Sequence, residues 1–174
     1  MGKAIVGKKA PDFELLASGG KRIRLAKLKG RPVVLYFYPK DDTPGCTLEG
    51  KDFRDLHARF TRLGAVILGV SRDTLASHER FCDKYAFPFD LLSDEDEKAC
   101  KLYGVIKMKN MYGRKVRGIE RSTFLIGKDG RLLHEWRKVK VAGHAAAVLE
   151  ALMSPPADRA PAESKKAPAR RKKT

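Results

Sequence analysis

The chain has 174 residues, of which 43% are hydrophobic, and a formal net charge of +16. This length and composition suffice for one domain with a substantial core. Three cysteines do not make the disulfide framework of a small secreted protein. The N-terminus lacks the apolar core of a signal peptide, and every apolar run is far shorter than the roughly 20 residues of a membrane span. We therefore expect a cytoplasmic protein, without membrane contact, whose thiols rest in the reduced state.

The positive charge is unevenly distributed along the chain. Residues 154–174 carry seven Lys or Arg, two acids and no core-forming residues. Such a composition predicts a disordered basic tail, after a single folded domain over residues 1–153. The tail could bind nucleic acid non-specifically by neutralising phosphates, although basic ends are often no more than solvated termini. Both interpretations stay open.

Residues 11–92 predict an N-terminal β-hairpin followed by three strands and two helices. The hairpin lies within residues 11–25, around the turn signal Gly19-Gly20. Continuous apolar runs at 33–38 and 65–71 indicate buried strands. Between them, an amphipathic helix begins at or near Cys46 and continues to Phe60. A second helix is expected over 74–85, with a short strand near 89–92.

The second half predicts a mixed sheet with helices on its faces. The acidic run 94–97 should form the first turn of a helix that Ser93 or Asp94 caps. Strands at 122–126 and 132–136 are joined by the hairpin signal Asp129-Gly130. A closing helix spans 144–153. This order of elements is typical of an α/β domain.

Cys46 is the residue that best indicates chemistry. It lies where a buried strand gives way to a helix, and the unpaired N–H groups and dipole of a helix N-terminus favour a reactive thiolate. Thr43, three residues earlier, could bring its hydroxyl to the thiolate or to an oxygen bound beside it. Pro39 and Pro44 restrict the loop. A small core cysteine is the alternative interpretation.

The pattern Pro39-x-x-x-Thr43-x-x-Cys46 resembles the active-site signature of the peroxiredoxins, in particular their bacterioferritin-comigratory or Q-type branch. Residues 111–113 and 118–126 carry the same resemblance, which spans about residues 5–152. It implies a thioredoxin-like fold with an N-terminal hairpin and a thiol peroxidase acting on hydrogen peroxide and organic hydroperoxides. It also implies that Cys46 is the peroxidatic cysteine, that Arg121 faces it and that Thr43 donates its hydroxyl.

The resemblance departs from the family pattern at the resolving cysteine. Many relatives carry a second cysteine five residues after the first, where this chain has Lys51. Cys82 stands where another subgroup carries its resolving cysteine, whereas Cys100 matches no family position. The resemblance therefore implies an intramolecular disulfide between Cys46 and Cys82, reduced by thioredoxin or a similar dithiol donor. Core packing of Cys82 is compatible with that role until its helix opens.

Other classes of function find little support in the residues. The chain has no Cys-x-x-Cys pattern, which a thiol–disulfide oxidoreductase would usually carry. Its four histidines show no metal-ligand spacing, and no Gly-rich phosphate loop occurs. We therefore expect no cofactor and no metal. We also expect a monomer.

Overall fold

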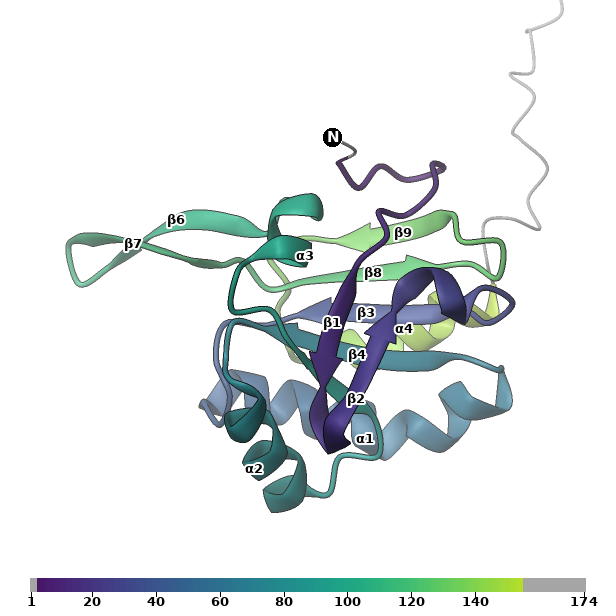
Figure 1. Cartoon of the computed structure of the whole chain (residues 1–174), viewed down its shortest axis with the longest axis horizontal. Coiled ribbons are helices and arrows are strands. Elements are labelled where there is room, and N and C mark those ends of the chain that lie inside the picture. The colour runs from purple at the N-terminus through teal and green to yellow at the C-terminus, as the bar shows by residue number, and fades with distance from the viewer. Residues whose placement is uncertain (1–2, 155–174) are drawn as a thin grey trace, which may run out of the picture.

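The computed structural model describes residues 3–154, so the predicted tail, apart from Ser154, lies outside the described residues. A seven-stranded mixed sheet forms the centre of the molecule (Figure 1). In spatial order its strands are β2 (Lys21–Arg24), β1 (Glu14–Ala17), β5 (Asp90–Ser93), β4 (Val66–Ser71), β3 (Val33–Phe37), β8 (Ser122–Ile126) and β9 (Leu132–Trp136). The pairs β3–β4 and β4–β5 are parallel and the others antiparallel. Within residues 3–154, no helix is long and apolar enough to cross a membrane.

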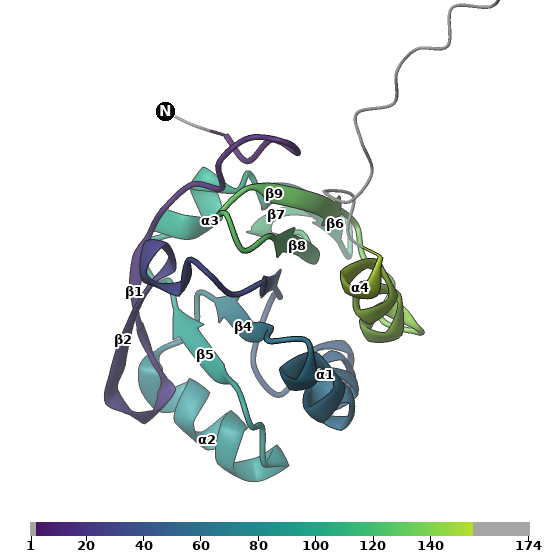
Figure 2. The same ribbon diagram turned by 90° about the vertical axis from the view of Figure 1, so that its right-hand side faces the viewer.

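Helices cover both faces of this sheet (Figure 2). One face packs against α1 (Pro44–Arg62), α2 (Leu75–Tyr85) and α4 (His144–Met153). The other face packs against α3 (Lys98–Leu102), the segment before β1 that contains Ala10 and Phe13, and the short helical turn η2 (Leu25–Leu28). Alternate residues of a strand point to opposite faces, so Tyr36 joins the α1 side and Phe37 the α3 side. A strand buried on both faces explains the uninterrupted apolar run of β3.

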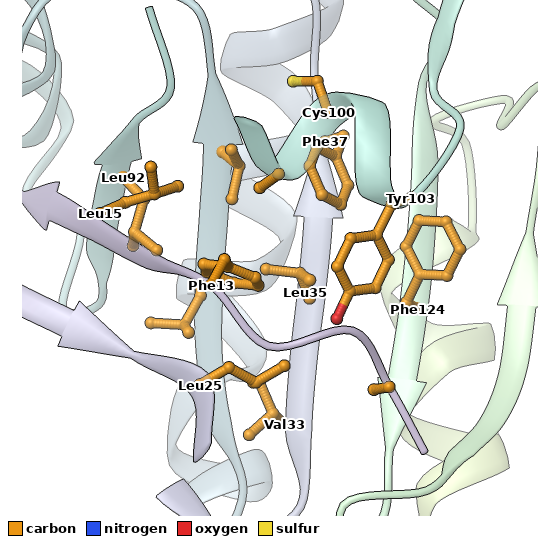
Figure 3. Close-up of a cluster of buried hydrophobic side chains, with 14 of the residues drawn as sticks. Phe13, Leu15, Leu25, Val33, Leu35, Phe37, Leu92, Cys100, Tyr103 and Phe124 are labelled. Atoms are coloured by element: carbon orange, nitrogen blue, oxygen red, sulfur yellow. The ribbon is translucent and has the colours of Figure 1, made fainter. Parts of the chain in front are cut away.

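The core on the α3 side encloses Cys100 (Figure 3). The Tyr103 ring packs edge-on against Phe124, with 4.9 Å between the ring centroids, and lies 5.5 Å from the Phe37 ring. The Tyr103 hydroxyl donates a hydrogen bond to the carbonyl oxygen of Pro11 at 2.8 Å. Cys100 is completely buried beside these rings. This environment is that of a residue that packs the core.

Most predicted elements are confirmed, including the N-terminal hairpin, whose strands β1 and β2 are joined through η1 (Ser18–Gly20). The prediction that the acidic run 94–97 forms the first turn of a capped helix is wrong, because α3 begins only at Lys98. Glu97 precedes it with a left-handed φ of 58°, which an α-helical first turn does not allow. Asp94 nevertheless caps this helix from a distance, since its Oδ2 accepts the backbone N–H of Cys100 at 2.8 Å.

One hairpin was not predicted. Strands β6 (Ile106–Met111) and β7 (Arg114–Ile119) form a separate two-stranded ribbon that projects from the body (Figure 1). Tyr112 and Gly113 make its turn, with φ angles of 51° and 77°. The tip is fully exposed at Tyr112. The base of the ribbon leads through Ile119 and Arg121 into β8, at the same edge of the sheet as the start of α1.

Candidate active site

Cys46 is the third residue of α1, in the turn whose N–H groups have no partner within the helix. Thr43 is the N-cap and Pro44 the first helical residue, a position that suits proline because its fixed φ fits the helix and its missing N–H is not needed there. The Cys46 side chain is only 2% exposed. Cys46 therefore stands at the start of a helix, as the sequence predicted, but its thiol is buried.

Arg121 reaches this thiol from the neighbouring strand. Ser122 pairs with Phe37, the last residue of β3, so Arg121 stands directly beside the loop that leads into α1. Its Nη2 donates a hydrogen bond to Cys46 Sγ at 3.4 Å. Gly45 makes room for this contact, because a Cβ there would lie 3.1 Å from the same Nη2. The structure thus brings together two residues that are 75 positions apart in the sequence.

Glu49 is a site residue that sequence reasoning missed. Its Oε1 accepts a hydrogen bond from Arg121 Nη1 at 2.7 Å, and its side chain is 1% exposed. Burial raises the pKa of Glu49 to about 7, against the opposing attraction of Arg121. Its second oxygen, Oε2, has no hydrogen-bond partner within the described residues. The available signal was its spacing, since residues i and i+3 of a helix share a face and Glu49 follows Cys46 by three.

The charge of Arg121 is held by its two partners. Burial alone would lower the pKa of Arg121, but Glu49 and Cys46 raise it above its ordinary value. Its guanidinium therefore stays protonated and offers a planar fork of donors at the thiol. One arm of the fork holds Glu49 and the other is directed at Cys46.

Thr43 and Pro39 line the loop without contacting the thiol through a hydrogen bond. The Thr43 hydroxyl donates to the carbonyl oxygen of Lys40 at 2.9 Å. Pro39 is half-buried at the end of β3. A hydroxyl carries a single proton, so Thr43 must leave Lys40 before it can donate to a bound oxygen. The structure thus joins Cys46 to Arg121 but leaves Thr43 on its own loop.

Two further polar residues lie close enough to Arg121 for its charge to lower their pKa values. His144, at the start of α4, hydrogen-bonds Thr123 Oγ1 through Nε2 at 2.7 Å. Burial and the charge of Arg121 lower the pKa of His144 to about 4, so the ring is neutral near pH 7. Lys109 of β6 donates from Nζ to the Ile119 carbonyl oxygen. Burial and, to a smaller extent, the positive charge of Arg121 lower the pKa of Lys109 as well.

The three cysteines, all of them free thiols, lie in two different layers. Cys82 of α2 is half-buried against the same apolar cluster that contains Cys46 and Tyr36. Its Sγ donates to Ser18 Oγ at 3.6 Å, and burial raises the pKa of its thiol. Cys100 belongs to the cluster on the other face of the sheet, and burial raises the pKa of its thiol too. Only Cys82 therefore shares a layer with Cys46.

One group of side chains has the composition of a metal site. Asp41, Asp73 and His78 place a carboxylate or imidazole atom each within 4.8 Å of one another. These atoms already bond within the protein, however: Asp41 Oδ2 contacts His78 Nδ1 at 2.7 Å, and Asp73 Oδ2 accepts the Asp41 N–H at 2.9 Å. The group is therefore explained as a polar network, which lies between the loop before α1 and the start of α2.

Comparison with known proteins identifies the family. The model of the AhpC/TSA family matches residues 6–135. Peroxiredoxin Bcp of Xanthomonas campestris is 57% identical over 81% of this chain and 88% of its own, and Peroxiredoxin Bcp of Bacillus subtilis is 52% identical over 84% and 94%. The chain belongs to the peroxiredoxin family. It is accordingly a thiol peroxidase, as the motif around Cys46 predicted.

Solved structures agree with this assignment. A PrxQ mutant from Xylella fastidiosa superposes with a TM-score of 0.83 at 44% identity, over 88% of this chain and 98% of its own. Peroxiredoxin Q of Xanthomonas campestris, in two different cysteine-to-serine mutants, gives a TM-score of 0.79 at 55% identity, over 82% and 90%. The thioredoxin-like peroxiredoxin fold is thereby confirmed. Peroxiredoxins act on peroxides and are recycled by thioredoxin-type reductants.

Proposed function

We propose that Cys46 is the peroxidatic cysteine of this peroxiredoxin and that Arg121 activates it. The observation that carries the proposal is the hydrogen bond of 3.4 Å from Arg121 Nη2 to Cys46 Sγ in the first turn of α1. A guanidinium beside the sulfur favours the thiolate, and its remaining donor capacity can bind the oxygens of a peroxide. Thr43 turns its hydroxyl to the same oxygens on substrate binding, while Pro39 shapes the loop.

The reaction follows from this arrangement. The Cys46 thiolate attacks one oxygen of the hydroperoxide, so that an S–O bond forms and the O–O bond breaks. The departing oxygen takes up a proton and leaves as water or an alcohol, and Cys46 becomes sulfenic acid. Charge that develops on the departing oxygen is stabilised by the Arg121 guanidinium. The substrates are hydrogen peroxide and organic hydroperoxides. The Xanthomonas campestris bacterioferritin comigratory protein has been described for alkyl peroxide reduction, which supports the second class.

We assign resolution of the sulfenic acid to Cys82. Its thiol attacks the Cys46 sulfur, an S–S bond forms, and the hydroxyl leaves with the Cys82 proton as water. Support comes from the shared layer of Cys46 and Cys82 and from a spacing. The two serine mutants of Xanthomonas campestris Peroxiredoxin Q fall 36 positions apart, which is also the spacing of Cys46 and Cys82. Thioredoxin or a similar dithiol then reduces the bond.

Kinetics of point variants test these roles. In a thioredoxin-coupled assay, Cys46→Ser should abolish peroxide consumption, whereas Arg121→Ala should leave a slower enzyme whose Cys46 reacts more slowly with iodoacetamide near neutral pH. Arg121→Lys, which keeps the charge but loses the planar fork, should fall between the wild type and Arg121→Ala. Residual turnover in Cys46→Ser would defeat the assignment of Cys46. An unchanged alkylation rate in Arg121→Ala would place the guanidinium outside the reaction.

A second candidate function concerns residues 154–174. Their seven Lys or Arg against two acids favour non-specific contact with nucleic acid phosphates. In this proposal the enzyme is a cytoplasmic monomer that its basic tail keeps near nucleic acid. Salt titration of duplex binding by the full chain and by a chain shortened to residue 154 tests it, because the full chain should bind more tightly and show the steeper salt dependence.

A further inference from the structure

The loop that leads into the peroxidatic helix also holds the helix that carries Cys82. Asp41 supplies a buried contact at the N-terminal end of α2. Its Oδ2 accepts a hydrogen bond from Ser77 Oγ at 2.8 Å and contacts His78 Nδ1 at 2.7 Å. Its Oδ1 accepts from the Tyr38 hydroxyl at 2.6 Å. One carboxylate thus ties the end of β3, the loop and the first turns of α2 together.

The polar groups at this contact are buried and bond to one another. His78 is completely buried, and its other ring nitrogen, Nε2, lies 2.9 Å from the Leu92 carbonyl oxygen of β5. Both ring nitrogens of His78 therefore face oxygen atoms of the protein. The Asp41 backbone N–H in turn donates to Asp73 Oδ2, just before α2 begins. Because these polar groups are one another's partners, breaking one contact leaves others unsatisfied.

Asp42, the next residue of the loop, supplies an exposed contact at the opposite end of α2. Its Oδ2 pairs with Lys84 Nζ at 2.8 Å, and its Oδ1 accepts from the Tyr85 hydroxyl at 2.8 Å. Asp42 holds this position with a left-handed φ of 54°, which is unusual for a residue other than glycine. Lys84 and Tyr85 form the last turn of α2. The loop therefore contacts α2 through side chains near both ends of the helix.

Cys82 lies between the two contacts. It follows His78 by four residues and precedes Tyr85 by three, so it is about one helical turn from each. Its Sγ is held at Ser18 of η1, and α2 covers the same apolar layer as α1. A disulfide requires the two Cα atoms to approach to about 4.4–6.8 Å. In the reduced protein Cys82 Sγ is held at Ser18, beside β5, whereas Cys46 follows β3, and β4 lies between these two strands. Unwinding the turns of α2 on either side of Cys82 to bring it to Cys46 would displace the residues that make the two contacts.

We propose that Asp41 and Asp42 are positioning residues that keep α2 folded while peroxide reacts at Cys46, and that release of their contacts sets the rate at which Cys82 reaches the sulfenic acid. The proposal rests on the role of Cys82 given above. It adds that the same loop shapes the peroxidatic site and governs the resolving step. Local opening of an element has its own free energy, which ranges from near zero up to that of global unfolding.

The proposal has a chemical consequence, because Cys46 sulfenic acid has two fates. Cys82 can attack the sulfur, releasing water and leaving the disulfide. Alternatively, a second peroxide can transfer an oxygen to the sulfur, its O–O bond breaks, water or alcohol leaves, and Cys46 becomes sulfinic acid. The first fate depends on the opening of α2 and the second on peroxide concentration. The peroxide concentration that gives equal amounts of both products therefore reports the opening rate.

Asp42→Asn and Asp41→Asn in the full chain test this. The Asp42 variant weakens an exposed pair, so disulfide formation should speed up roughly two- to fivefold. The Asp41 variant removes a charged acceptor from buried donors and should speed it up about tenfold or more. Asp129→Asn is the matched control. Asp129 also pairs with a cationic side chain, that of Arg131, and accepts the backbone N–H of the same residue, but it lies in the turn between β8 and β9.

Two measurements give the result. Quenched-flow mass analysis after a peroxide pulse follows sulfenic acid, disulfide and sulfinic acid in the same samples, so the resolving step is separated from the first attack. The peroxide concentration that yields equal disulfide and sulfinic acid should rise by the same factor as the resolving rate. Hydrogen exchange of the α2 amides in the reduced protein should accelerate in both variants, and more in Asp41→Asn than in Asp42→Asn. The control should match the wild type in both.

The outcomes are distinguishable. Unchanged resolution and unchanged α2 exchange in Asp42→Asn would overturn the proposal, and so would slower resolution, since the contacts would then favour the productive geometry. If Asp41→Asn fails to fold, Asp42→Asn alone decides. A wild-type disulfide that lacks Cys82 would instead defeat the assignment of the resolving cysteine. In that case α2 exchange still shows whether the two aspartates hold the helix.

Discussion

Replacing Glu49 by glutamine tests whether ionisation of a buried carboxyl group destabilises the peroxidatic pocket. Glutamine has nearly the same shape, and its amide oxygen can still accept the hydrogen bond of Arg121 Nη1. It cannot ionise. Glu49 is 1% exposed, and its Oε2 has no hydrogen-bond partner within residues 3–154. The variant therefore removes one negative charge while leaving the packing of α1 in place.

The size and sign of the effect follow from the pKa of Glu49, which rises from 4.5 to about 7 on folding. A raised pKa means that the folded protein binds the proton more tightly than the unfolded chain. The stability that this proton contributes is complete below about pH 4.5 and is lost as pH rises to about 7. A difference of about 2.5 between the two pKa values corresponds to about 3 kcal/mol. In the Glu49→Gln variant this position does not ionise, so the variant should not lose this stability as pH rises.

Urea unfolding followed by Trp136 fluorescence over a pH series measures this difference. We expect wild type and Glu49→Gln to have similar free energies of unfolding at acidic pH. Above neutral pH the variant should be more stable by about 3 kcal/mol. Glu150→Gln, which removes an exposed carboxylate from α4, is the control and should run parallel to the wild type. Parallel curves for Glu49→Gln would refute the reasoning. A wild type that gains on the variant as pH rises would show that Arg121 outweighs burial.

Three further predictions concern the core, the spare cysteine and the tail. Gly50→Ala should destabilise the fold by about 1–3 kcal/mol in urea unfolding, because a Cβ there would lie 2.5 Å from Cζ of Phe87; an unchanged midpoint would show that the ring can move away. Cys100→Ser should lower stability by about 1–3 kcal/mol, since it buries a hydroxyl among apolar rings, yet retain peroxide turnover; a loss of turnover in a folded variant would give Cys100 a chemical role. Deleting residues 155–174 should leave peroxidase activity and melting nearly unchanged, and it should flatten the salt dependence of duplex binding by about 0.9 in the log–log slope for each phosphate that the tail neutralises. Equal slopes for the two chains would end the nucleic-acid hypothesis for the tail.

The parts of the fold that the sequence predicted well are those in which local pattern and burial agree. The apolar run at β3 and the Pro-punctuated loop after it predict a buried strand followed by a helix that begins at or near Cys46, and α1 begins at Pro44, two residues earlier. The β6–β7 ribbon was missed because β7, which places Arg114, Lys115 and Arg117 around Val116, does not alternate regularly between apolar and polar residues. Its turn, Tyr112-Gly113, lacks the Asn-Gly or Asp-Gly signal of a tight hairpin.

The site was predictable where residue type carries the chemistry and unpredictable where tertiary packing decides. Cys46 could be selected by its place at a helix start, and the family motif supplied Arg121. Glu49 shares the helical face of Cys46, but only the packing of α1 determines whether that face meets a pocket or solvent. The contact between Asp41 and His78 joins residues 37 positions apart, and no local pattern encodes it.

Peptide mapping tests most directly whether Cys46 is oxidised beside Arg121 and resolved by Cys82. The reduced full-length chain is treated with one equivalent of hydrogen peroxide, alkylated and digested without reductant. We expect a single intramolecular disulfide between the peptides of Cys46 and Cys82, with Cys100 recovered in alkylated form. A peptide that joins Cys46 to Cys100, or disulfides found only between two copies of the chain, would contradict it.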